Sequence, residues 1–256
     1  MLYGKSYKTE AVVLKKIKLG EADRILTLLT PESGKIQAVA KGVRKPKSKM
    51  AGHLELLTHS LITLNRGRNL DTITGCQTIE GFLPLKNDLT LMSHALYITE
   101  LTDQFTIGQE VSRDVFQLLL NAYKYLCDLR NKEIILRYFE MQLLNLTGFS
   151  PELQNCVNCR RKLEPVTNYF SSEAGGILCP DCTTGRAVSY PVTVNALKIL
   201  RLLQNADILF LVKIKIDTEL YRELEEISRR YVKYILEKEL KSTEWMDNLK
   251  SNQAFQ

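Results

Sequence analysis

The chain has 256 residues, of which 45% are hydrophobic and 25% charged, a composition that predicts a globular protein of two or three modules. No apolar run approaches the roughly 18 residues of a membrane span, and the first residues lack the apolar region of a secretory signal, so we expect a soluble, cytoplasmic protein. The net charge of +6 is uneven, because residues 1–75 hold 14 Lys and Arg against 6 Asp and Glu, and the remainder holds 21 against 23. This asymmetry predicts that the N-terminal module faces a polyanion.

Residues 7–79 show short apolar runs, many of them β-branched, separated by turn residues such as Pro31 and Gly34. Strands are predicted at 9–14, 24–29, 36–40, 58–64 and 70–74, and the loop between the last two carries Gly67 at its tip. Five short strands suit a small antiparallel β-barrel. We therefore predict an OB-fold over residues 1–80, because this fold closes with five strands and commonly binds nucleic acid.

A basic segment lies between the third and fourth predicted strands, and it is too rich in Gly, Pro and Ser for a helix. Its cations are Lys41, Arg44, Lys45, Lys47 and Lys49. Further cations in or beside the predicted turns, which would extend the same face, are Lys35, Arg66 and Arg68. Flexible cations neutralise phosphates without reading bases, which predicts salt-sensitive, sequence-tolerant binding. A solvated surface loop without a ligand is the alternative.

From residue 81 the pattern becomes helical. Apolar residues at helical spacing predict helices at about 88–105, 112–129, 131–148, 193–203 and 217–241, with Asp88 or Thr90 and Ser112 as N-cap candidates. These helices predict a helical domain in two parts, residues 81–150 and 187–242. Residues 151–186 form an insert between them, and residues 243–256 are expected to be a flexible tail.

Four cysteines in the insert form two C-x-x-C pairs, Cys156 with Cys159 and Cys179 with Cys182, separated by nineteen residues. This spacing is typical of a zinc ribbon, in which two tight turns and a short hairpin supply four thiolates to one metal ion. A closed Cys₄ site has no open position for substrate, so one structural Zn²⁺ per chain is predicted. A redox pair, disulfides and an iron–sulfur site are the alternatives.

We find no motif that predicts catalysis. The phosphate-cradling G-x-x-x-x-G-K-[ST] is absent, and so are H-E-x-x-H and G-x-S-x-G. Glu21 and Asp23 form a close acidic pair that would suit a metal-dependent nuclease, but Arg24 beside them favours a structural turn with local ion pairing. The sequence therefore predicts a binding protein, not an enzyme.

Three segments of the N-terminal module, residues 12–30, 34–44 and 64–68, resemble the bacterial RecO family, and the Cys₄ insert within a helical domain is similar to its zinc-bearing members. The resemblance covers essentially the whole chain. It implies a multidomain α+β protein, with an N-terminal antiparallel β-barrel (OB-fold) followed by an α-helical domain that carries an inserted Cys₄ zinc ribbon.

The resemblance also implies a function in DNA repair and recombination. Family members bind single- and double-stranded DNA, anneal complementary strands and help to load RecA onto strands coated with single-stranded-DNA-binding protein. RecR, and often RecF, are the implied partners, and a nucleoid-associated location in the cytoplasm follows. The implied DNA contacts are Arg24, Lys35, Lys41, Arg44, Lys45, Lys47, Lys49, Arg66 and Arg68. A zinc-ribbon RNA-binding or transcription factor is the alternative, and contact of the basic segment with a lipid surface is a weaker one.

Overall fold

The computed structural model describes residues 6–106, 113–183 and 188–253. The chain divides into two compact units. Unit 1 contains residues 1–128 and 244–256, and unit 2 contains residues 129–243. Ser112, an N-cap candidate, and the predicted insert boundary at residue 186 lie outside the described residues. No helix within the described ranges is long and apolar enough to cross a membrane.

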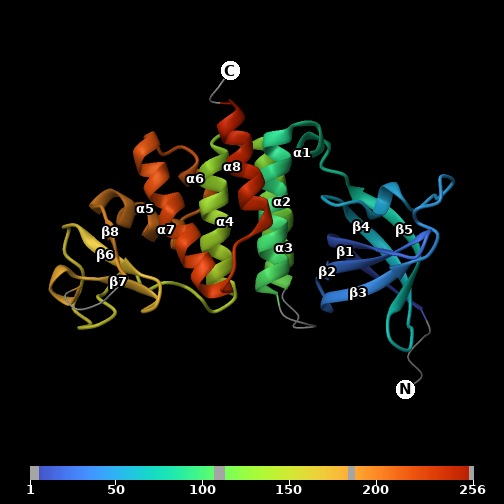
Figure 1. Cartoon of the computed structure of the whole chain (residues 1–256), viewed down its shortest axis with the longest axis horizontal. Helices are drawn as coiled ribbons and strands as arrows, with labels where there is room; N and C mark the ends of the chain where they lie inside the picture. Colours follow the sequence, from blue (N-terminus) through green and yellow to red (C-terminus); the bar gives the residue numbers. More distant parts are fainter. Residues whose placement is uncertain (1–5, 107–112, 184–187, 254–256) are drawn as a thin grey trace. The chain divides into compact units, whose positions relative to one another are not determined.

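The N-terminal part of unit 1 is a closed five-stranded barrel, as predicted (Figure 1). Its strands are β1 (Ser6–Leu19), β2 (Asp23–Thr30), β3 (Gly34–Ala40), β4 (His59–Asn65) and β5 (Asp71–Glu80), in the order β1-β2-β3-β5-β4. All pairs are antiparallel except β3 with β5, which pair in parallel at Ala38–Asp71 and Val39–Thr72. β3 shows why this sequence forms a barrel strand, because Ile36, Ala38 and Ala40 point into the buried core while the residues between them face outward.

Helices α1 (Leu83–Asn87), α2 (Leu89–Phe105) and α3 (Arg113–Asp128) follow the barrel. The Asp88 carboxylate caps α2 by accepting a hydrogen bond from the Leu91 N–H at 2.8 Å. α2 packs against β1, and α3 packs against β2. Val12 and Leu29 are paired, fully buried and outside the barrel core cluster, so these helices cover that part of the barrel's outer face.

His59 lies where β4 meets α3. Its ring lies edge-on to the Phe116 ring, with centroids 5.7 Å apart, and its Nε2 hydrogen-bonds to the Glu10 carboxylate at 2.8 Å. Burial lowers the pKa of His59 below its ordinary value, although Glu10 opposes this effect. The imidazole is therefore protonated more readily in the unfolded chain than in the folded one.

This difference predicts a pH-dependent stability. The contribution of neutral His59 is complete above its unfolded pKa of about 6.5 and decreases as the pH falls through that value. We expect the free energy of unfolding of the wild type to fall between pH 7 and pH 5, and part of this fall to disappear in His59→Gln. Urea unfolding at both pH values measures it, with His53→Gln as the control. An unchanged pH dependence in His59→Gln would contradict the prediction.

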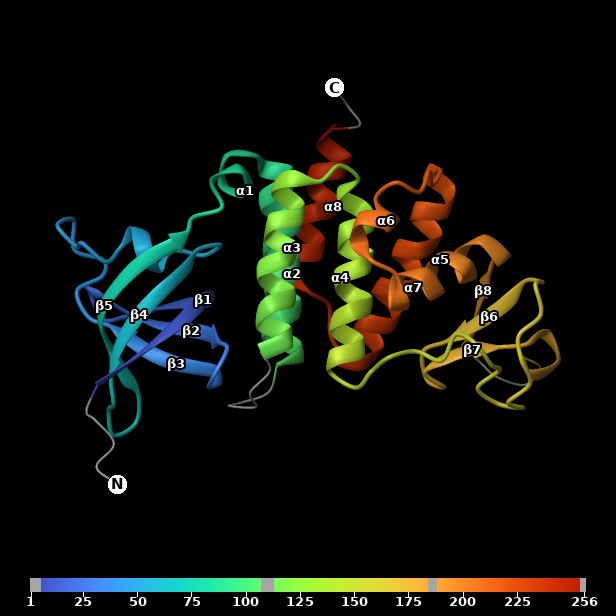
Figure 2. The ribbon, with the colours of Figure 1, turned by 180° about the vertical axis from the view of Figure 1, so that it is seen from behind.

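Unit 2 combines helices with a small sheet (Figure 2). The helices are α4 (Lys132–Leu146), α5 (Val194–Asn205), α6 (Ile208–Leu211) and α7 (Thr218–Leu236). The sheet holds β6 (Asn168–Ser171), β7 (Gly176–Leu178) and β8 (Tyr190–Val192), in the order β7-β6-β8. The hairpin of β6 and β7 agrees with the predicted ribbon, and β8 adds a strand that the sequence did not predict. α7 ends before residue 241 because Glu237 adopts a left-handed conformation.

The prediction of a flexible tail at 243–256 is wrong for most of that segment. Residues Lys241–Gln253 form helix α8, and residues 244–256 belong to unit 1. Met246 is 3% exposed and Trp245 is half-buried. Burial of these side chains explains the helix, since a short segment with many polar residues has little helical stability of its own.

Candidate nucleic-acid interface and metal centre

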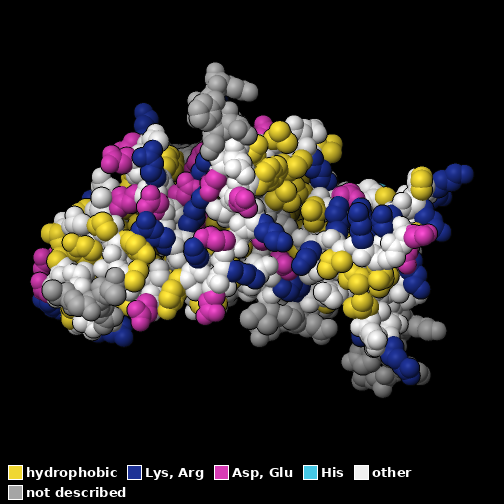
Figure 3. All heavy atoms as spheres, in the orientation of Figure 1, with side chains coloured by type: hydrophobic (Ala, Val, Ile, Leu, Met, Phe, Trp, Pro, Cys, Tyr) yellow, Lys and Arg dark blue, Asp and Glu magenta, His cyan; other side chains and the backbone are white. Residues whose placement is uncertain are grey.

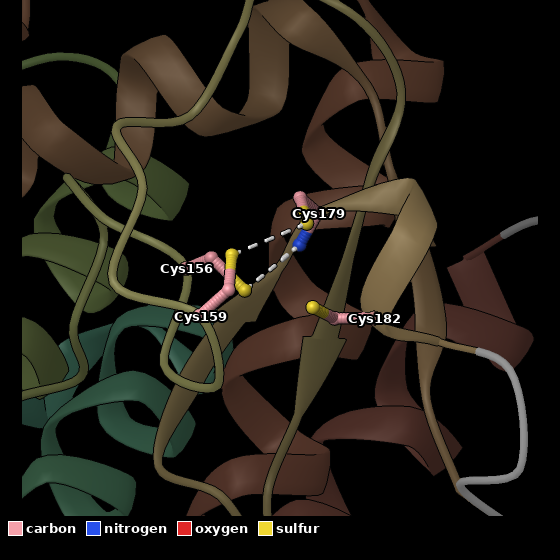
Figure 4. A group of neighbouring side chains, drawn as sticks. All are labelled: Cys156, Cys159, Cys179 and Cys182. Carbon is pink, nitrogen blue, oxygen red and sulfur yellow. Dashed lines mark hydrogen bonds between the residues drawn. The ribbon is translucent and has the colours of Figure 1, made fainter.

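The four cysteines of the insert converge on one point, as predicted (Figure 4). All four sulfur atoms lie within 4.8 Å of one another, and the Sγ atoms of Cys159 and Cys179 are 3.8 Å apart. A tetrahedral site with metal–sulfur distances of about 2.3 Å places its sulfurs about 3.8 Å from each other. The cluster therefore has the dimensions of a site that could hold one metal ion.

Two tight turns position these cysteines. In the first, the Cys156 N–H donates to the Arg161 carbonyl at 2.8 Å, and the Arg160 N–H donates back to the Cys156 carbonyl at 2.9 Å. In the second, the Cys182 N–H donates to the Cys179 carbonyl at 3.0 Å. The Val157 N–H donates to the Ile177 carbonyl at 2.9 Å, which joins the first turn to strand β7. The short C-x-x-C spacing thus produces the local turns, and the hairpin brings the turns together.

Arg161 provides a positive charge beside the cluster. Its Nε donates to Cys159 Sγ at 3.4 Å, and its guanidinium also pairs with Asp181 at 2.8 Å. Arg161 lowers the pKa of the Cys159 thiol to about 6, whereas burial and the neighbouring thiols raise the pKa of Cys179 to about 12. A bound cation would favour the thiolate form of all four cysteines.

The basic segment after β3 is folded back onto the β1–β2 turn. The Gly42 N–H donates to the Asp23 carboxylate at 2.7 Å, and the Arg44 N–H donates to the Ala22 carbonyl at 2.9 Å. The Arg44 side chain also donates to the Gly20 carbonyl at 3.1 Å. Gly42 has a φ of +64°, a conformation that a larger side chain rarely adopts. Asp23, which the sequence linked to local ion pairing or a nuclease site, therefore anchors the basic segment.

The anchor predicts a measurable change in local stability. Asp23→Ala removes the acceptor of a charge-assisted hydrogen bond, so the segment should open about tenfold more often. Limited digestion with trypsin should then cleave after Lys41, Arg44 and Lys47 faster than in the wild type. Asp23→Asn is the matched control, because its amide oxygen can still accept the Gly42 N–H. Equal cleavage rates in Asp23→Ala and the wild type would contradict the anchor.

The predicted phosphate contacts fall into two groups in the structure. Arg24 pairs with Glu55 at 3.0 Å, and Lys35 binds the Asp103 carbonyl at 2.6 Å and its carboxylate at 3.3 Å. These two cations are thus already engaged within unit 1. The exposed cations of the set are Lys41, Arg44, Lys45, Lys47, Lys49, Arg66 and Arg68. They come from the β3–β4 and β4–β5 connections, and Figure 3 shows Lys and Arg side chains on the surface of the barrel region.

Glu55 was not singled out from the sequence. It also forms an ion pair with Lys16, and although burial opposes ionisation, Lys16 and Arg24 hold the pKa of Glu55 below its ordinary value. Glu55 lies far along the chain from both cations, so no local pattern points to this network. Because Glu55 pairs with Lys16 and Arg24, these two cations are already neutralised within the barrel. The cations of the basic segment stay exposed.

A hollow of about 420 Å³ lies between β3 and the β4–β5 loop. Its lining includes Tyr7, Gln37, Arg66 and Asn69. The Arg66 guanidinium lies 5.2 Å from the centre of the Tyr7 ring, and the Tyr7 hydroxyl donates to Asp71 at 2.5 Å. Lys35 also lines the hollow, which therefore combines two predicted contacts, Lys35 and Arg66, with polar side chains that were not predicted.

Comparison with known proteins shows close similarity along nearly the whole chain. Residues 4–82 match the family model described as Recombination protein O N terminal, and residues 86–244 match Recombination protein O C terminal. DNA repair protein RecO of Dehalococcoides mccartyi is 46% identical over 243 residues, which cover 95% of this chain and 96% of the relative. DNA repair protein RecO of Desulforamulus reducens is 38% identical over 249 residues, which cover 97% of each chain.

Proposed function

Since the chain belongs to the RecO family of DNA repair proteins, we propose that it binds single- and double-stranded DNA and anneals complementary strands without catalysing a reaction. The observation that carries this proposal is the anchored basic segment on the barrel. It presents Lys41, Lys45, Lys47 and Lys49 at the surface, and Asp23 holds its base in place. Lysines bind phosphate as point charges and do not distinguish bases, which suits a protein that must accept many sequences.

Annealing needs no active site. Two complementary strands repel each other through their phosphates, and cations on the protein surface reduce this repulsion by neutralising charge and releasing counterions. Base pairing then supplies the driving force. The predicted contacts that would serve in this step are the exposed cations of the two barrel connections, whereas Arg24 and Lys35 would act mainly by holding the surface together.

The metal of the cysteine cluster is proposed to be one structural Zn²⁺. Four thiolates at tetrahedral spacing form the donor set that zinc prefers, and such a set leaves no coordination position for a substrate. When bound, the ion would cross-link the two turns through Cys156, Cys159, Cys179 and Cys182. Its role would be to stabilise the fold of the insert and not to react with DNA.

The family relationship also supports a set of partners and a location. RecR, and in some settings RecF, would bind this protein, and together they would help to load RecA onto strands coated with single-stranded-DNA-binding protein. The protein would then act in the cytoplasm, close to the nucleoid. Affinity pull-down of purified RecR and of single-stranded-DNA-binding protein would test the direct contacts.

The experiment that tests the function is an annealing assay in a salt series. Complementary strands carrying a fluorophore and a quencher, and coated with single-stranded-DNA-binding protein, are mixed with this protein without nucleotide. We expect annealing that is faster than the spontaneous reaction and becomes slower as salt increases. No acceleration by folded, metal-loaded protein would overturn the proposal, and preferential binding to structured RNA would favour the RNA-binding alternative.

A further inference from the structure

The outer face of the barrel carries apolar side chains that the described residues of unit 1 leave partly exposed. Ile17, Ile25 and Val39 lie in one row across β1, β2 and β3, because Ile17 pairs with Ile25 and Ile25 pairs with Val39. None of the three belongs to the barrel core cluster. Ile17 is 43% exposed, and Leu19, on the same face of β1, is 41% exposed. We call Ile17, Leu19, Ile25 and Val39 the apolar strip.

Positive charges lie beside the apolar strip. Lys15 lies one step along the same face of β1, Lys41 immediately follows the end of β3, and both are exposed. The anchored basic segment continues from Lys41, whereas Lys18, although exposed, lies on the face of β1 opposite to Ile17. The acidic groups nearby are Glu21 and Asp23, of which Asp23 already accepts the Gly42 N–H. Figure 3 shows exposed hydrophobic side chains on the barrel with Lys and Arg side chains beside them.

This combination indicates one kind of ligand. We propose that the apolar strip binds the bases of unpaired DNA while the neighbouring lysines bind its phosphates, which makes this face selective for single strands. The inference rests on the proposed function and extends it to strand preference. Unpaired bases expose apolar faces that gain free energy when they leave water. In a duplex these faces are stacked inside the helix, so the strip would meet only the charged backbone.

The hollow between β3 and the β4–β5 loop could continue the binding surface for a single strand beyond the apolar strip. Gln37 follows the strip along the outer face of β3 and also lines the hollow, together with Arg66 and Asn69. A volume of about 420 Å³ is within the range of small-ligand sites, which begin at roughly 300 Å³. The guanidinium of Arg66 offers a plane on which a base can stack, and the amides of Gln37 and Asn69 can hydrogen-bond to base edges. A single strand that crosses the strip would place its next nucleotide here.

The test compares three probes with equal numbers of phosphates, namely a mixed-sequence single strand, a base-less strand and a duplex. Wild type should bind the single strand more tightly than the base-less strand. Ile17→Thr keeps a β-branched residue in β1 but makes the surface polar, so it should weaken binding of the single strand about threefold to tenfold. Binding of the duplex and of the base-less strand should stay unchanged. Leu19→Thr should act in the same direction.

The matched control is Ile79→Thr. Ile79 is 51% exposed in β5, a strand that pairs with β3 only at Asp71 and Thr72, so it lies outside the strip. This variant should bind all three probes as the wild type does. Equal affinity of the wild type for the normal and base-less strands would overturn the inference, and so would equal losses for single strand and duplex in Ile17→Thr. Absence of any DNA binding by the wild type would instead overturn the proposed function.

Discussion

Replacing Lys45, Lys47 and Lys49 together with alanine is expected to flatten the salt dependence of DNA binding. Each phosphate contact contributes about 0.9 to the slope of log K against log salt on duplex DNA, and about 0.7 on single strands. Loss of three contacts should therefore reduce the slope by about 2.7 and about 2.1, respectively. All three side chains are exposed and their loop is held at Gly42 and Arg44, so the variant should fold normally. Fluorescence anisotropy at several salt concentrations measures the slopes.

A matched control removes the same charge elsewhere. Lys213, Lys215 and Lys238 are exposed in unit 2, so their replacement with alanine lowers the net charge by the same amount. If the loop makes local contacts, this control should keep the wild-type slope. An equal reduction in both triple variants would show that total charge, and not the anchored segment, governs binding. An unchanged slope in the loop variant would remove this segment from the interface.

The second large effect is expected at the cysteine cluster. Cys156 is fully buried, and its sulfur accepts a hydrogen bond from the Cys179 N–H at 3.4 Å. Cys156→Ser should abolish tight zinc binding, and in zinc-finger peptides the free energy of that binding, about 10–16 kcal/mol, is coupled to folding. If Cys156→Ser lowers the free energy of unfolding by only about 3 kcal/mol, the midpoint of thermal unfolding should fall by roughly 6–12 °C. Metal analysis of the purified protein and calorimetry measure the two effects.

Cys127→Ser is the control for this experiment, because Cys127 is half-buried in α3 and lies outside the cluster. It should keep the metal content of the wild type, and a chelator should shift the unfolding of the wild type toward that of Cys156→Ser. Stoichiometric zinc in Cys156→Ser would contradict a four-cysteine site. Iron in place of zinc would favour the iron–sulfur alternative.

Local patterns were sufficient to predict the elements whose side chains repeat regularly. In α3, Val115, Leu119, Ala122 and Leu126 recur at helical spacing, and all four are buried. The cysteine cluster was predictable for the same reason, since each C-x-x-C pair makes its own turn. The core of β3 likewise follows from simple alternation of inward and outward residues.

Elements that depend on distant contacts were not predictable in this way. β1 continues to Leu19, beyond the predicted end at residue 14, because residues 15–19, three of which are lysines, pair with β2. α8 and the anchoring role of Asp23 depend on parts of the chain that meet only after folding. The periodicity of a sequence carries no information on contacts between distant segments. The cations could therefore be identified from the sequence, but which of them form ion pairs and which stay exposed could not.

The division of the chain has a consequence for the order in which the protein folds during synthesis. Unit 1 is discontinuous, because residues 244–253 join it only after the whole of unit 2 has been translated. At about 5–20 residues per second, the ribosome needs on the order of 10 s to make the intervening segment. The hairpins of β1, β2 and β3 can pair as they emerge, since their contacts are close in sequence. Completion of unit 1 must wait for α8, so this unit begins to fold first and finishes after unit 2 has been made.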